Sequence, residues 1–513
     1  MKANLRRCSP RLCDWLAIAL SVAGILAAAW VTRNIYQAIP HLEDEIAYAW
    51  QADLLAEGKL SMPSPSYPHS FLVPFVVDHD GLRFSKYPPG WPAVLAAGVL
   101  LGLRAWVNPL LAGLGVWLTY RLGRRLFNAG VGLLAAALTV TSPFFLLNSG
   151  SLLSHPLGLA LTAGFTWAWL AAFGPQPARR PWLPTLAGAA LLVALMLTRP
   201  VTALAVTLPF VLHGQVLWLR GSAGQRYRLL VITLTGLAGI GLYLVWQNSL
   251  TGDPWLNPYT LWWPYDRIGF GPGVGATEAG HTLGRALDNL GQAFRAGSYD
   301  LFGWGSFSWL FLPFGLWAAR RNFSALLSGS VFLSLVAVYM TYWVGATLYG
   351  PRYYYESLFS LTILSAAGIF WLAGWLRGPG RLLQPAAGWR KLRPLLVVWL
   401  AGVLIGINLT LYTPIRLHGM TDLFGISAAD QQPFLQPEVQ ALAPALVIVH
   451  TDLWMEYGAL LDLQDPDLTT PLIFSWAVNP ETDRQLAAAY PARDVYHYYP
   501  ARQPFRLYPQ PQP

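Results

Sequence analysis

The sequence has few charged residues: aspartate, glutamate, lysine and arginine make up 12% of its 513 residues, about half the usual share. Hydrophobic residues make up 54%, and the mean hydropathy is +0.40. This composition excludes a disordered chain and argues strongly against an ordinary soluble enzyme. Cysteine is almost absent, since Cys8 and Cys13 are the only two, so a disulfide framework is excluded and no zinc site is indicated.

Several motifs of soluble catalysis are also absent. The sequence contains no Walker A motif, no GxGxxG fingerprint, no HExxH and no GxSxG nucleophile elbow. A mechanism that uses a nucleotide therefore has no visible site, and a donor dissolved in the membrane is favoured over a water-soluble one.

What the sequence does contain is a series of long apolar runs, which predict a polytopic α-helical membrane protein. A membrane-spanning helix needs about 17–25 mostly apolar residues. We predict about eleven spans: 15–32, 105–120, 129–147, 157–174, 182–198, 200–219, 229–247, 304–319, 323–343, 355–376 and 394–412. A further apolar run, 91–103, is short for a span, so we predict that it is re-entrant or interfacial.

The charge distribution predicts the orientation of these spans. If the N-terminus is cytoplasmic, the cytoplasmic segments hold 19 of the 34 lysines and arginines and only one of the 25 acids. This bias follows the positive-inside rule, so the net charge of +9 indicates membrane topology and no nucleic-acid partner. Frequent Pro, Arg and Trp, with no eukaryotic retention signal, indicate a bacterial plasma membrane.

Alternation of the spans places the large polar segments outside the cytoplasm. These segments are the loops 33–104, 248–303 and 344–354 and the tail 413–513. In the tail, the pattern predicts a small extracytoplasmic α/β domain with strands at 446–450, 471–476 and 494–498 and a helix at 481–490. We therefore predict a membrane domain, 1–412, and a second domain, 413–513. The simpler interpretation of the second domain is that it packs against or caps the membrane domain and has no catalytic role.

The first outer loop opens with three consecutive acids, Glu43, Asp44 and Glu45. The pattern of apolar residues over 44–57 predicts an amphipathic helix that ends at Gly58. Such a helix suits a position at the membrane interface. A carboxylate at a helix N-terminus stays ionised, so it can act as a general base or hold a metal. The alternative is simple N-capping by Asp44 or Glu43.

Two cations lie beside aromatic residues in the outer loops. Lys86, next to Tyr87, either binds the phosphate of a lipid-linked substrate or reaches past the protein to lipid phosphate. Arg352, next to Tyr353, has the planar fork that suits a phosphate, unless it pairs with Glu356 four residues on.

Two histidines complete the candidate groups. His281 lies in the aromatic-rich loop 248–303 and could donate to a phosphate or shuttle a proton, although a lone loop histidine is more often neither. His155 lies in a short polar turn outside the membrane, and Arg199 is similarly placed between two spans.

An Asp-Glu pair after the first span, a Lys-Tyr-Pro-Pro segment that ends the first outer loop and an Arg-Tyr pair in a late outer loop resemble the GT-C glycosyltransferases. The basic segment 121–127 and the following 133–143 add to the resemblance, which covers about residues 10–412. The most similar branch contains the protein O-mannosyltransferases and the lipid A aminoarabinose transferases. The resemblance implies an integral-membrane glycosyltransferase that moves a sugar from a polyprenyl-phosphate carrier to an acceptor lipid, glycan or protein on the outer face, with inversion.

The resemblance also implies roles for particular residues. Asp44 matches the loop acid of the family, expected to be the general base, and Glu45 completes the catalytic pair. The side chains expected to bind substrate are Lys86, Tyr87, His155, His281, Arg352 and Tyr353. Many relatives carry an acid at the second outer turn, where this sequence has His155, so the resemblance leaves a divalent metal cofactor open.

Two other functions also stay open. A transporter or flippase would carry ionisable groups near the membrane midplane, and the predicted spans contain almost none. A lipid-linked glycan polymerase or ligase would share the donor and the topology, and would differ in its acceptor.

Overall fold

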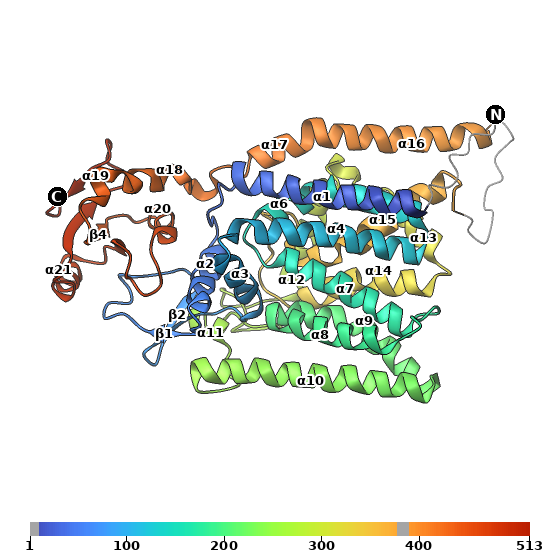
Figure 1. Ribbon diagram of the computed structural model, residues 1–513, viewed down its shortest axis with the longest axis horizontal. Helices are drawn as coiled ribbons and strands as arrows, with labels where there is room; N and C mark the ends of the chain where they lie inside the picture. Colours follow the sequence, from blue (N-terminus) through green and yellow to red (C-terminus); the bar gives the residue numbers. More distant parts are fainter. Residues whose placement is uncertain (1–9, 377–388, 513) are drawn as a thin grey trace.

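Long helices that run side by side dominate the computed structural model, which describes residues 10–376 and 389–512 (Figure 1). The helices of this bundle are α1 (Pro10–Asn34), α4 (Val107–Leu126), α5 (Ala129–Val140), α6 (Pro143–Gly150), α7 (His155–Phe173), α8 (Trp182–Thr198), α9 (Pro200–Arg220), α10 (Ala223–Thr251), α13 (Leu312–Ala319), α14 (Phe323–Tyr339), α15 (Leu358–Leu372) and α16 (Trp389–Ile407). Figure 1 shows α16 and α10 at opposite edges of the bundle, with α1, α4 and α7 between them. Two of the predicted cytoplasmic segments that carry many of the basic residues, 1–14 and 377–393, lie partly outside the described residues.

Six of the described helices are long and apolar enough to cross a membrane, or seven if the bent pair α5 and α6 forms one span. Three shorter apolar helices add to these: α3 (Gly90–Leu100), α8 and α14. The chain is therefore a multi-pass membrane protein by length and composition, and the count of eleven spans stays a prediction.

The predicted span 129–147 is broken. Helices α5 and α6 meet at an angle of 60° because Pro143 cannot continue the hydrogen-bond ladder of α5. Ser142 starts α6 by accepting the backbone N–H of Phe145 at 3.2 Å, and its hydroxyl donates to the carbonyl of Leu301 at 2.6 Å. The prediction from the sequence identified the apolar run but did not include the break within it.

The prediction of a continuous helix over 304–319 is wrong. Helix α13 covers only Leu312–Ala319, about 12 Å of rise, which is too short to cross a bilayer. Gly303 and Gly305 adopt positive φ angles of 66° and 58°. This left-handed conformation prevents a continuous α-helix in the segment before α13.

The loop between α1 and α4 folds at one end of the bundle. It contains α2 (Glu43–Ala56), α3 and a three-stranded sheet in the order β1-β3-β2, formed by Met62–Pro63, Leu82–Ser85 and Val76–His79. Helix α2 matches the predicted helix, and Gly58 after it has φ of 79°. Its apolar residues Ile46, Ala49 and Leu54 are buried inside the protein and therefore do not face lipid, while the predicted position of the helix at the membrane interface stays a prediction.

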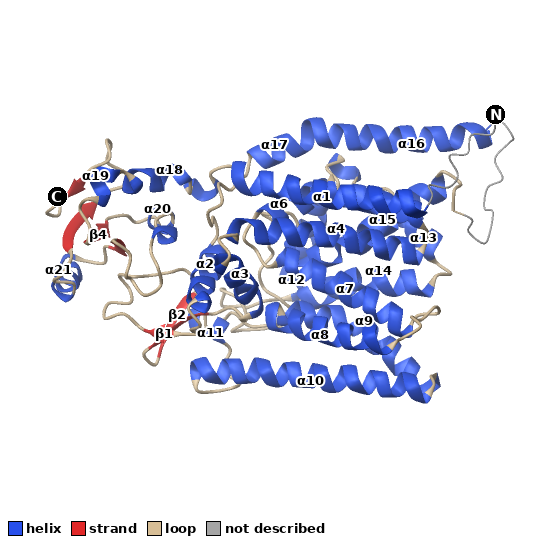
Figure 2. Cartoon of the chain, in the orientation of Figure 1, coloured by secondary structure: helices blue, strands red, loops and turns tan. Residues whose placement is uncertain are grey.

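Within the described residues, all strands lie beyond the same end of the helix bundle, in the first loop and in the tail (Figure 2). The tail contains a four-stranded sheet in the order β5-β4-β6-β7, in which β4 (Ala445–Val449) pairs in parallel with β5 (Leu472–Trp476) and β6 (Asp494–Tyr498). Strand β7 (Leu507–Tyr508) is antiparallel to β6, and α21 (Pro480–Ala489) connects β5 to β6. The three predicted strands and the predicted helix lie where the structure has β4, β5, β6 and α21.

Six further α-helices lie within the described residues, and all of them except α12, with 18 residues, are short. These are α11 (Pro258–Trp262), α12 (Leu283–Asp300), α17 (Thr413–His418), α18 (Ala428–Gln431), α19 (Pro437–Gln440) and α20 (Trp454–Gly458).

The tail sheet packs directly on the first loop. Phe71 is buried among Leu446, Ile448 and Ile473 of the sheet, and the backbone N–H of Trp476 donates to the carbonyl of Ser70 at 2.6 Å. The tail therefore supports the loop that carries α2 and α3.

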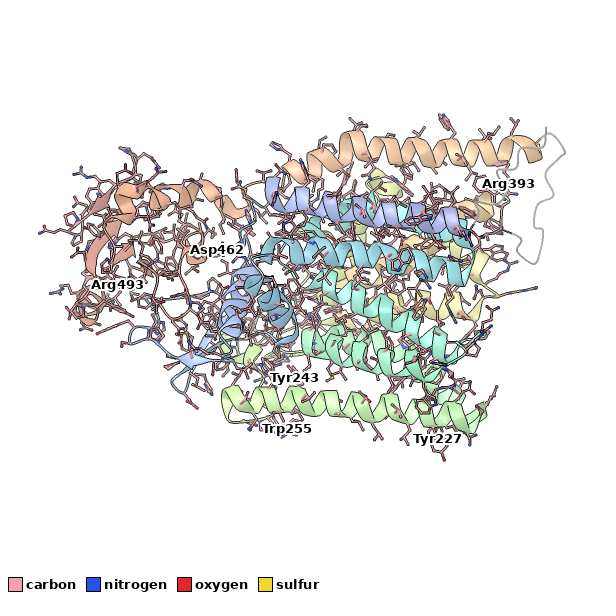
Figure 3. All side chains as sticks on the ribbon, in the orientation of Figure 1. Tyr227, Tyr243, Trp255, Arg393, Asp462 and Arg493 are labelled. Carbon is pink, nitrogen blue, oxygen red and sulfur yellow. The ribbon has the colours of Figure 1, made fainter. Side chains whose placement is uncertain are left out.

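A bidentate ion pair joins the end of the first loop, just before α4, to the tail. Both terminal nitrogens of Arg104 donate to the carboxylate of Asp462, at 2.7 and 2.8 Å, and Figure 3 labels Asp462 between the two parts. We expect Arg104→Ala to lower the free energy of unfolding by about 1–3 kcal/mol, because the partly buried carboxylate loses its charged donor. Thermal unfolding of the protein in detergent checks this. Arg484→Ala, which breaks the exposed pair with Glu481, is the control and should change nothing measurable; equal effects of the two variants would contradict the prediction.

Candidate active site

Glu45 anchors the start of α2. Its Oε2 accepts the backbone N–H groups of His41 and Leu42, at 2.8 and 3.2 Å, and its Oε1 accepts the N–H of Leu152, at 2.8 Å. The side chain is buried, and burial raises the pKa of Glu45 to about 7. Both carboxylate oxygens accept hydrogen bonds from backbone N–H groups. The geometry therefore favours a role for Glu45 in positioning the start of α2 over the predicted catalytic role.

Asp44, the residue before Glu45 in the same turn, contacts different partners. The hydroxyl of Tyr87 donates to its Oδ1 at 2.5 Å, and Arg352 Nη2 lies 3.5 Å from its Oδ2. Asp44 lies inside α2, whose N-cap is Leu42, so Asp44 does not cap the helix as in the alternative interpretation, and its side chain keeps 21% of its surface exposed. Burial raises the pKa of Asp44, but the charge of Arg352 and the Tyr87 hydrogen bond outweigh it, so this pKa lies below its usual value.

Lys86 is enclosed, not extended toward lipid. Its residue is 2% exposed, and its Nζ lies 3.4 Å from Oδ2 of Asp266. Four aromatic rings surround the ammonium at 3.6–5.4 Å from their centroids: Phe75, Trp263, Tyr259 and Tyr87. The interpretation of Lys86 as a lipid-facing cation is therefore wrong.

Arg352 has donors to spare. It lies at the start of a 3₁₀ helix, Arg352–Ser357, and its ion-pair partner is Asp44, not Glu356, which the sequence analysis left open as the alternative. Its Nε is buried and has no hydrogen-bond partner among the described residues. A guanidinium that is held on one side and unpaired on the other can bind an incoming oxyanion.

Glu356 instead joins a buried cluster with His155 and Arg199. Its Oε1 lies 3.1 Å from both His155 Nδ1 and Arg199 Nε, and the glutamate is fully buried. Arg199 also donates to the hydroxyl of Ser154 at 2.9 Å and to that of Tyr339 at 3.3 Å. A Cβ at Gly158 would lie 2.7 Å from the same carboxylate oxygen, so glycine leaves room for this cluster.

Removing the charge of Glu356 should destabilise the protein. Glu356→Gln leaves the Arg199 guanidinium largely buried without a counter-charge, and we expect a loss of about 3–5 kcal/mol in unfolding free energy. Thermal unfolding in detergent measures the loss, with Glu57→Gln at the exposed pair with Lys59 as the control. A variant as stable as the parent would show that Glu356 does not balance this charge.

The other predicted substrate-binding residues are placed as follows. Tyr353 stacks on Tyr339 with centroids 4.7 Å apart, which brings it beside the Arg199 cluster. The Nε2 of His281 donates to the carbonyl oxygen of Met340 at 2.9 Å, and the ring stacks on Phe270. The contacts that the structure gives His281 therefore do not include Asp44, Lys86 or Arg352.

The structure thus brings Asp44, Lys86, Tyr87 and Arg352 together from three segments far apart in sequence. It adds three charged residues that the sequence prediction did not assign to the site: Arg199, Asp266 and Glu356. A signal existed for two of them, because Glu356 was the only charge within a predicted span and Arg199 stood alone between two spans.

The residues around Asp44 do not fit a divalent metal. Among residues 10–376 and 389–512, no group of three or more His, Cys, Asp or Glu side chains is placed to hold a metal ion. The near partners of Asp44 are a guanidinium and a phenol, which are hydrogen-bond donors. No step below uses a metal.

An apolar groove of about 470 Å³ has part of its wall next to Arg199 in sequence. It lies between α7, α8, α9 and α10, and Met196 and Pro200 at its wall flank Arg199 in sequence. The wall continues along α9 to Trp218, about 27 Å from Pro200 along the helix. A groove of this length and polarity suits a hydrocarbon chain.

Comparison with solved structures shows the fold class. ArnT from Cupriavidus metallidurans bound to undecaprenyl phosphate matches with a TM-score of 0.56 and 15% identity, over 94% of this chain and 89% of that one. The apo oligosaccharyltransferase of Archaeoglobus fulgidus matches with a TM-score of 0.51 and 12% identity, over 93% and 69%. No family model and no curated sequence matches. Both structures are GT-C glycosyltransferases, so this chain has the GT-C fold.

Proposed function

We propose that this protein is an integral-membrane glycosyltransferase that takes a sugar from a polyprenyl-phosphate carrier. The observation that carries the proposal is Asp44, an ionised carboxylate held by Tyr87 and Arg352, with Lys86 nearby, in a chain with the GT-C fold. A carboxylate with two cations around it suits a reaction in which a base takes a proton while a phosphate leaves.

The reaction is a single displacement. Asp44 accepts the proton of an acceptor hydroxyl or amine, whose oxygen or nitrogen attacks the anomeric carbon of the sugar. The bond from that carbon to the phosphate oxygen breaks, and polyprenyl phosphate leaves with the electron pair. Attack on the face opposite the leaving group inverts the configuration. Arg352 and Lys86 stabilise the negative charge that develops on the phosphate.

The apolar groove supports a lipid-linked donor. Its wall at Met196 and Pro200, on either side of Arg199 in sequence, and its run along α9 would let an isoprenoid chain lie in the groove while the phosphate reaches the cations. In the proposed orientation the site, the first loop and the tail lie on the outer side of the membrane. The acceptor lipid, glycan or protein binds on that outer side.

Purified protein incubated with radiolabelled polyprenyl-phosphate sugar and a membrane extract as the source of acceptors tests the proposal. We expect release of polyprenyl phosphate and appearance of label in an acceptor. Label that is carried across vesicle membranes with the carrier bond intact would instead show a transporter or flippase. Label added only to a growing lipid-linked chain would show a polymerase.

A further inference from the structure

The ammonium of Lys86 is an unusual buried cation. It is 2% exposed, and aromatic rings close it off on several sides, with the Phe75 centroid 3.6 Å from Nζ. The rings attract a cation, but they offer no strong hydrogen-bond acceptor to replace water. A carboxylate is therefore needed to hold the charge in this box.

Asp266 is the carboxylate that supplies this contact. Its Oδ2 lies 3.4 Å from Lys86 Nζ, while its Oδ1 accepts the Tyr342 hydroxyl at 3.0 Å and the Trp343 indole N–H at 3.1 Å. These two donors come from a different segment, so the position of Asp266 does not depend on Lys86. The lysine side chain is flexible, and the aspartate that it meets is fixed.

The other groups that face Lys86 do not replace Asp266. Glu43 and Asp44 on α2 are the remaining acids that act on it, and Tyr87 and Tyr259 face it with their rings. Asp44 is itself paired with Arg352. Burial lowers the pKa of Lys86, and Asp266 provides the largest opposing effect.

We propose that Asp266 is a positioning residue that keeps Lys86 protonated and fixed within its aromatic box, so that the donor phosphate always meets a cation. This rests on the proposed function, because it assumes that Lys86 binds the donor phosphate. This role does not involve contact between Asp266 and the substrate. Asp266 acts through Lys86, and its own negative charge would repel an anionic donor that came close to it.

The proposal has a specific consequence for pH. Asp266→Asn keeps an oxygen for Tyr342 and Trp343 but removes the negative charge, so Lys86 loses its proton at a lower pH than in the parent. Once the amine is neutral, the donor KM rises about tenfold per pH unit, whereas kcat at saturating donor changes less. A merely structural role would instead reduce activity by the same factor at every pH.

The experiment measures donor KM and kcat between about pH 6 and pH 9.5 for the parent and Asp266→Asn. We expect KM values within about threefold at the acid end and a rise of at least about tenfold for the variant at the alkaline end. The double variant Lys86→Arg with Asp266→Asn should lose this rise, because a guanidinium stays charged. Asp253→Asn, an exposed aspartate in the same loop, is the control. Parallel KM profiles of parent and Asp266→Asn would overturn the proposal.

A second measurement needs no substrate, so it separates this inference from the proposed function. Cyanate reacts with neutral amines, and peptide mass spectrometry quantifies its addition to Lys86 against pH, with the surface residue Lys59 as an internal reference. We expect Asp266→Asn to be modified at lower pH than the parent. Equal pH dependence of Lys86 modification in the two proteins would overturn the role of Asp266 even if transfer is observed. Absence of transfer by the parent would overturn the proposed function and leave the labelling result valid.

Discussion

Asp44→Asn should reduce sugar transfer by about 10²–10⁴-fold, because an amide cannot accept the proton of the acceptor. Donor binding should not weaken, since the substitution removes a negative charge beside the site of the phosphate and leaves Arg352 without its ion-pair partner. Transfer of radiolabelled sugar and binding of polyprenyl phosphate alone measure the two effects separately.

Glu43→Gln is the matched control for Asp44. Glu43 lies in the same helical turn and carries the same charge, but no ion pair joins it to Arg352 in the described structure. Its substitution should leave transfer within about threefold of the parent. Full activity of Asp44→Asn, or equal losses in the two variants, would show that Asp44 is not the base.

Arg352→Gln should have the next largest effect, a fall of about 10²–10³-fold in kcat/KM. The guanidinium lies 3.5 Å from Asp44 and has a buried Nε without a partner among the described residues, so it can serve the carboxylate and the phosphate together. Loss of one preorganised cation at a developing oxyanion accounts for the magnitude.

The same variant should change the pH profile. Because the charge of Arg352 lowers the pKa of Asp44, its removal raises that pKa. The base must be deprotonated to act, so the acid limb of kcat/KM should move to higher pH in Arg352→Gln. Arg267→Gln, at an exposed arginine of the 248–303 loop, should leave both the rate and the acid limb unchanged. An acid limb that stays in place would mean that Arg352 does not act on Asp44.

The cations of the site share one feature: each has a carboxylate partner from a distant part of the chain. Arg352 pairs with Asp44, Lys86 with Asp266 and Arg199 with Glu356. Buried charges are costly unless they are paired, so these contacts stabilise the end of the bundle as well as arranging the chemistry. A phosphate that binds here meets a site whose charges are already balanced and oriented.

Much of the architecture follows from the sequence by itself. Apolar runs of sufficient length predict the bundle, and Asp44, Lys86 and Arg352 were candidates because of their positions in the outer loops and the resemblance to the GT-C glycosyltransferases. Local patterns also predict α2 and the tail strands, since period and turn residues act over a few positions.

Only the tertiary structure decided the partners of the charged side chains. It showed that Glu45 serves the backbone, that Lys86 is enclosed with Asp266 and that Glu356 belongs to Arg199 and His155. It also showed the break at Pro143, which composition alone conceals. The physical reason is that hydrophobicity is a property of each segment, whereas an ion pair depends on which segments meet, and the residues of these pairs are up to 308 positions apart, as in Asp44 and Arg352.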